Sequence, residues 1–260
     1  MLRILNVVFF AATVIVNGLA NILPIAQVKT EDISQKYQHL LSPADFSFSI
    51  WGVIYVLLAG FVWYQALKKH DYIAKRCGVW FMLSCAANAL WMVFWHYEML
   101  ALSVVCMGVI VWALTVINAR LADENDTWQA KVFVQAGLGL YLGWSCIAAA
   151  ANAASFLVQS NFSGFGLSDE VWTVALLLLI ALLTVLLLNR FGNVFTGIAV
   201  AWGIIGVLVQ HFTTYQMRYG WAVAACIAAL LIIFVRIWQL VDSENAGMFR
   251  VAHAHNKREE

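Results

Sequence analysis

Charged side chains are scarce in this chain. Lys, Arg, Asp and Glu make up 11% of its 260 residues, whereas an average soluble domain carries about 25%. The formal net charge is only +1, so the chain lacks the basic excess that would attract nucleic acid. These shortages exclude an ordinary soluble domain and give no support to a nucleic-acid partner.

The usual signatures of soluble enzymes and metal sites are also missing. The chain has no glycine loop for phosphate, no HExxH pair and no GxSxG elbow. Its five cysteines form no CxxC pair, and its six histidines show no ligand spacing. We therefore expect no metal site and no covalent cofactor, and no catalytic residue can be named from these motifs.

Apolar residues are what the chain has in abundance, at 63%. A membrane core needs about 20 apolar residues of helix, and eight uncharged runs are of that order. They cover residues 5–25, 48–67, 78–95, 99–118, 132–157, 171–188, 194–210 and 220–240. The sequence predicts an all-α integral membrane protein with about eight transmembrane helices.

The first run allows a second interpretation. Arg3 resembles the basic start of a signal peptide, and Gly18 and Ala20 resemble a cleavage site. Cleavage there would leave seven spans. The sequence alone keeps both interpretations open.

The distribution of basic residues predicts the orientation. Lys and Arg accumulate on cytoplasmic loops. With a cytoplasmic N-terminus, twelve of these residues fall on inner segments and three, Lys29, Lys36 and Arg218, on outer ones. We therefore expect both termini in the cytoplasm, in a membrane that the sequence does not identify.

One long polar loop interrupts this pattern. Residues 26–47 are mixed in charge and bounded by Pro24 and Pro43, and loops of this length tend to be functional or disordered. Residues 242–260 form a charged C-terminal tail. The remaining connections are short, so we expect a bundle wound in sequence order.

The fifth run carries aromatic, small and amide residues on one helical face. Measured from Tyr141, Ala148 and Asn152 lie within about 20° and Trp144 about 60° away. Small residues such as Gly143 and Ala148 allow a helix or a flat ligand to approach closely. The sequence predicts that this face borders a packed or hollow interior.

Two further runs repeat the combination of aromatic and polar groups. Asn88, Trp91 and Trp95 share a face of the third run, and Trp51 and Tyr55 lie one turn apart in the second. An amide in hydrocarbon needs a hydrogen-bond partner, so Asn88 is a candidate partner for Asn152. One interpretation is that these amides only join helices; the other is that they line a shared aromatic cavity.

Together these residues resemble the TspO/MBR family, the tryptophan-rich sensory or translocator proteins. The most specific part is YLGW, followed by Ala148 and Asn152, and the second and third runs supply Trp51, Tyr55, Asn88 and Trp91. The resemblance covers about residues 1–158, with Ser49 and Asp45 where the family usually has Pro and Trp. Residues 159–241 would then add three helices to the family's five-helix bundle.

The resemblance implies a ligand and a site. Family members bind tetrapyrroles such as porphyrin and haem beneath the first loop, so residues 26–47 would form the lid. The ligand-binding residues would be Trp51, Tyr55, Asn88, Trp91, Trp95, Tyr141, Trp144, Ala148 and Asn152. Some members degrade protoporphyrin in light, with Trp51 and Trp144 as the matching tryptophans, and many are homodimers.

Two other functions stay open at this point. An uncoupled small-solute transporter would suit the three extra helices and the glycine-rich seventh run, because interrupted helices often form transport sites. An ion-coupled carrier is disfavoured, because no Asp, Glu, Lys or Arg lies in the middle of a run. The other alternative is a regulatory membrane protein whose cavity binds lipid.

Overall fold

The computed structural model describes residues 1–22, 28–67, 70–124 and 127–259. The long helices are α1 (Leu2–Ile22), α3 (Ile50–Ala66), α4 (Asp71–His96), α5 (Leu100–Arg120), α7 (Gly137–Gln159), α8 (Asp169–Phe191), α9 (Val194–Thr213) and α10 (Gly220–Glu259). Shorter elements are α2 (Thr30–Lys36), η2 (Asp45–Ser49), α6 (Trp128–Ala130), η4 (Lys131–Ala136) and η5 (Gly164–Gly166). Within the described residues, eight helical segments are long and apolar enough to cross a membrane. The predicted fold class is confirmed.

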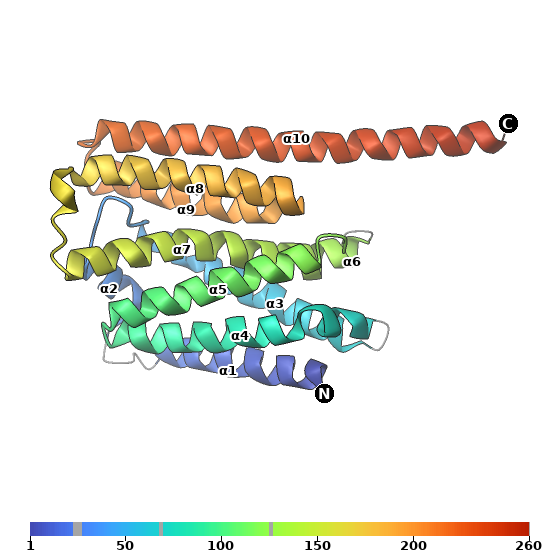
Figure 1. Ribbon diagram of the computed structural model, residues 1–260, viewed down its shortest axis with the longest axis horizontal. Helices are drawn as coiled ribbons and strands as arrows, with labels where there is room; N and C mark the ends of the chain where they lie inside the picture. Colours follow the sequence, from blue (N-terminus) through green and yellow to red (C-terminus); the bar gives the residue numbers. More distant parts are fainter. Residues whose placement is uncertain (23–27, 68–69, 125–126, 260) are drawn as a thin grey trace.

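The helices form one bundle, but several main contacts skip a span, so the bundle wound in sequence order that the sequence predicts is found only in part. α4 packs between α1 and α5, and α7 packs between α5 and α9, while α3 contacts α7, α1 and α4. α8 and α10 pack against each other, and both contact α9. Figure 1 shows α8, α9 and α10 together along one side of α7, with α1 and α4 on the other side. The last three helices are therefore joined to the first five mainly through α9, with weaker contacts from α8 to α5 and α7.

Buried polar groups hold α1 in the bundle. Asn6 donates to Gln65 Oε1 at 2.8 Å, and Thr13 donates to the carbonyl of Cys85 at 3.0 Å. One turn further, Asn17 donates to Asn88 Oδ1 at 2.8 Å. A stripe of polar groups at these spacings faces α3 and α4, because an unpaired polar group is costly in an apolar interior. Residues 2–22 thus have a structural role as a packed helix.

The glycines of the seventh run mark close packing. α9 is continuous from Val194 to Thr213, so the interrupted helix expected for a transport site is not found. A Cβ added at Gly203 would lie 2.8 Å from Ile147 of α7, and one at Gly197 would lie 2.9 Å from Ile237 of α10. Both distances are too short for van der Waals contact. These glycines let α7 and α10 approach α9, as small residues do between membrane helices.

The fifth span and the chain end differ from the sequence prediction. The fifth span begins at Trp128, earlier than expected, and passes through the π-helical turn η4 before α7. Thr127 caps its start by accepting a hydrogen bond from the Ala130 amide. The charged C-terminal tail continues the backbone of α10 as far as Glu259.

Candidate functional site

The loop predicted as a lid contains the short helix α2 and the 3₁₀ turn η2. Residues 26 and 27 of this loop lie outside the described residues. α2 packs on α4, where the Trp95 indole donates to the Thr30 carbonyl at 3.1 Å. η2 leads directly into α3 and contacts α9. The lid therefore bridges α4 on one side and α9 on the other.

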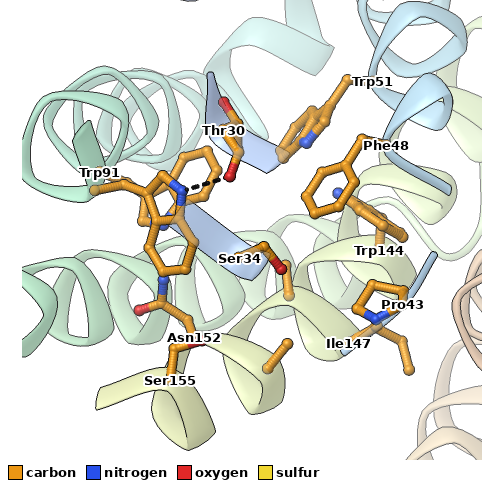
Figure 2. A pocket seen from close by; sticks show the side chains of 13 residues that line it. Thr30, Ser34, Pro43, Phe48, Trp51, Trp91, Trp144, Ile147, Asn152 and Ser155 are labelled. Atoms are coloured by element: carbon orange, nitrogen blue, oxygen red, sulfur yellow. Dashed lines mark hydrogen bonds between the residues drawn. The ribbon is translucent and has the colours of Figure 1, made fainter. Parts of the chain in front are cut away.

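A cavity of about 30 Å³ lies beneath this lid. Its walls are formed by Thr30, Ser34, Pro43, Phe48, Trp51, Trp91, Trp95, Trp144, Ile147, Ala148, Ala151, Asn152 and Ser155. Figure 2 shows Trp91 and Asn152 on one side, Phe48 and Trp144 on the other, and Thr30 and Ser34 of α2 between them. The site combines four tryptophans with the small residues of α7.

Trp51 is the centre of the aromatic wall. Its ring stacks on Tyr55 with centroids 5.5 Å apart, and it lies 6.0 Å from Trp91. Its edge contacts are with Tyr141 at 5.8 Å and Trp144 at 6.4 Å. Rings at these separations attract one another through their quadrupoles. The wall is thus a connected cluster from α3, α4 and α7.

The structure brings most of the predicted site residues together. Six of the nine line the cavity: Trp51, Trp91, Trp95, Trp144, Ala148 and Asn152. Tyr55 lines an adjoining compartment of about 70 Å³. Tyr141 lies behind the wall, where it contacts Trp51 and donates weakly to the Ser84 carbonyl at 3.5 Å. Asn88 also lies outside both linings. A ligand role for each of the nine stays a prediction.

The amide pairing expected from the sequence is wrong. Asn152 does not pair with Asn88; its Oδ1 accepts a hydrogen bond from Ser103 of α5 at 2.8 Å. Asn88 accepts instead from Asn17 of α1. Helical spacing places each amide on the correct inward face but does not identify the helix that faces it. Asn152 therefore joins the fifth span to the fourth, and Asn88 joins the third to the first.

Two indole N–H groups of the wall have no acceptor. The Nε1 atoms of Trp91 and Trp144 are buried and lack a hydrogen-bond partner, and the two side chains are only 4% and 1% exposed. An unpaired buried donor is costly. The cavity thus contains two donors that a bound molecule with acceptor atoms would satisfy.

Four hydrogen bonds attach the lid to α9 and the turn after it. The Ala44 amide donates to the Gly206 carbonyl at 3.0 Å, and the Trp202 indole donates to the Ser47 carbonyl at 3.0 Å. His211 Nε2 lies 2.9 Å from the Leu40 carbonyl, and the Tyr215 hydroxyl donates to the His39 carbonyl at 3.4 Å. Gly206 makes this approach possible, because a Cβ there would lie 2.0 Å from Ser47 Oγ.

Charged groups attach the outer side of the lid to the turn between α4 and α5. Lys36 pairs with Glu98 at 2.5 Å, and the Tyr37 hydroxyl donates to the same carboxylate. The Lys36 ammonium and the Tyr37 hydroxyl together lower the pKa of Glu98 below its usual value. Glu98 has a positive φ of 56° in this tight turn. The pair is exposed to solvent, so its contribution to stability is small.

His39 lines a second hollow and contacts Ala151 in the wall of the aromatic cavity. Its Nε2 lies 3.0 Å from the Ala151 carbonyl, and its Nδ1 accepts from the Leu41 amide at 3.2 Å. The second hollow, of about 130 Å³, is lined by His39 together with side chains of the lid, α7 and α8. A neutral imidazole with its proton on Nε2 satisfies both contacts. Burial lowers the pKa of His39 to about 4.

Sequence reasoning missed several wall residues. They are Thr30, Ser34, Phe48, Ile147 and Ser155, with Pro43 noted only as a loop boundary and Ala151 only as a small residue that allows close approach. Ser155 lies seven positions after Ala148, so the helical period used for α7 would have found it. The lid residues carry no periodic signal. Their place depends on how the loop folds back over the helices.

Among the described residues, no group of three His, Cys, Asp or Glu side chains comes together as a metal site would require. Searches among curated proteins and among solved structures found no match. A family model described as TSPO-like protein matches residues 3–238. This match runs beyond the first 158 residues and includes most of the last three helices. An aromatic cavity under a lid, in a bundle of membrane-spanning helices, is thus found in a chain that belongs to the TSPO-like protein family.

Proposed function

We propose that this TSPO-like membrane protein binds a planar hydrophobic ligand of the tetrapyrrole class, a porphyrin or haem, in the aromatic cavity, for sensing, transport or turnover. The observation that carries the proposal is the cluster around Trp51. It presents indole rings from three helices to one cavity, and two of its N–H groups have no acceptor. A flat apolar macrocycle gains from ring stacking, and its polar atoms can accept from the indoles.

The cavity volume sets a condition on this function. At about 30 Å³, the space under the lid holds no more than a water molecule. A macrocycle therefore needs the lid to move away from α7. The lid is held by hydrogen bonds and side-chain contacts with no covalent cross-link, because the cysteines are free thiols. We infer that the described conformation is a closed one.

The test is a titration of detergent-purified protein with protoporphyrin dimethyl ester in the dark. The ester carries no carboxylate, so ligand shape is tested apart from ligand charge. We expect saturable binding that weakens in Trp144→Phe and Asn152→Ala while both variants stay folded. Trp238→Phe is the matched control, because Trp238 on α10 is 67% exposed. Equal binding in all four proteins, or no saturation, would exclude this cavity as the site.

A further inference from the structure

A second compartment extends the aromatic cavity toward α1. It has a volume of about 70 Å³ and is lined by Asn17, Thr30, Glu31, Phe48, Trp51, Tyr55 and Met92. Thr30, Phe48 and Trp51 line both spaces. A ligand that displaces the lid reaches both compartments, because the shared wall belongs partly to the lid itself.

Glu31 brings a carboxylate into this compartment. Its Oε2 atom is buried and has no hydrogen-bond partner. The other acidic residues near it on the lid are paired: Asp32 accepts from the Lys29 amide, and Asp45 accepts from Gln35. Glu31 thus differs from these two residues, since its side chain is half-buried and one of its oxygens is fully buried without a donor. A buried carboxylate oxygen is costly unless a donor or cation meets it.

Basic side chains are missing from both linings. Among the described residues, no Lys or Arg lines the aromatic cavity or the compartment beside it. The donors in the two linings are neutral, and they include the indole N–H groups of Trp91 and Trp144 and the hydroxyl of Tyr55. Neutral donors satisfy a carbonyl, an ether or a ring nitrogen, whereas a desolvated carboxylate needs a cation.

From these observations we propose that the site selects its ligand by charge. Within the tetrapyrrole class, it favours rings that are uncharged, or that carry a cationic or N–H group toward Glu31, over free dicarboxylates such as protoporphyrin and haem. This inference rests on the proposed function of the same cavity. It adds Glu31 as the residue that determines charge specificity, because a carboxylate placed beside it meets a like charge with no base between them.

The experiment compares three porphyrins that share one ring: protoporphyrin, its dimethyl ester, and a diamide with ammonium side chains. Each is titrated into the unaltered protein, Glu31→Gln and Asp32→Asn. Asp32 is the matched control, because it loses the same charge from the same short helix but is exposed. Comparing ratios between variants cancels the partition of each porphyrin into micelles.

In the unaltered protein we expect the ester to bind roughly tenfold more tightly than the diacid, the scale of one like-charge contact in a partly desolvated site. The ammonium form should bind at least as tightly as the ester. Glu31→Gln should bring the three affinities together, and Asp32→Asn should leave their order unchanged.

The possible failures are distinguishable. An equal ratio of ester to diacid affinity in Glu31→Gln and in the unaltered protein overturns the charge inference and leaves the proposed function standing. Tighter binding of the diacid by the unaltered protein does the same, and this result needs no folded variant. A lack of saturable binding by all three porphyrins removes the proposed function and the inference together.

Discussion

Asn152 shows how one amide can serve two neighbours at the residue scale. Its Oδ1 takes a hydrogen bond from Ser103 on α5, and its side chain forms part of the cavity wall. Both partners are buried, at 3% and 0% exposed. Asn152 therefore stabilises the contact between α7 and α5 in addition to any contact with a ligand.

A double-mutant cycle tests this role. Asn152→Ala and Ser103→Ala each remove the bond, so each should lower the free energy of unfolding by about 1 kcal/mol, the size measured for such bonds between membrane helices. The double variant should lose less than the sum of the two. Thermal unfolding in detergent measures all four proteins. Strictly additive losses would show that the two side chains do not interact.

His39 gives the lid a dependence on pH. Burial lowers its pKa from the ordinary 6.5 to about 4. Between these two pH values His39 is protonated in the unfolded chain and neutral in the folded chain. Stability is therefore fully present above pH 6.5 and is lost as the pH falls toward 4. We expect the melting temperature to fall over this interval, with a smaller fall in His39→Gln. Parallel curves for the two proteins would contradict the assignment to His39.

At the scale of elements, α7 and α9 are fitted to each other through glycine. A Cβ at Gly143 would lie 2.2 Å from the backbone carbonyl of Thr196 on α9, whereas one at Gly108 on α5 would meet nothing within 4 Å. The carbonyl belongs to a helix backbone and cannot rotate away. A methyl group at Gly143 would therefore clash with α9, whereas one at Gly108 would enter open space.

We predict that Gly143→Ala lowers the free energy of unfolding by about 1–3 kcal/mol, as overpacking does. Gly108→Ala should leave it unchanged or raise it slightly, because Ala favours helix over Gly. Thermal unfolding of both variants beside the unaltered protein checks this. The packing of α7 on α9 would have to differ from the described one if Gly143→Ala were as stable as Gly108→Ala.

The spans and the inward faces of α3, α4 and α7 were predictable from the sequence, because apolar length and helical period are local properties. Which helix faces which was not. The partners of Asn88 and Asn152 depend on the arrangement of α1 and α5, which no local pattern encodes. The contact of α9 with the lid was missed for the same reason, since Trp202 and Gly206 lie far in sequence from the loop residues that they contact.

At the scale of the whole molecule, the number of membrane-length helices among the described residues is even. The start of the first helix and the end of the last therefore lie on the same side of the membrane. Figure 1 shows the N- and C-termini at the same end of the bundle. The excess of Lys and Arg on that side predicts that it is cytoplasmic. A fluorescent reporter that folds only in the cytoplasm should therefore be bright when fused after Glu260. A dark fusion with an active secreted-type reporter at the same position would reverse the orientation.

The bonds from α9 to the lid have a consequence for the rest of the bundle. A ligand that needs the lid displaced must break or strain the contacts of Ala44, Ser47 and Leu40 with α9. Linkage is reciprocal, so a second molecule that favours the displaced lid raises the ligand's affinity by the same factor by which the ligand raises the affinity for that molecule. The contacts of α9 with the lid therefore oppose ligand entry. A molecule that binds α8, α9 or α10 and favours one lid position would change the affinity of the cavity for its ligand.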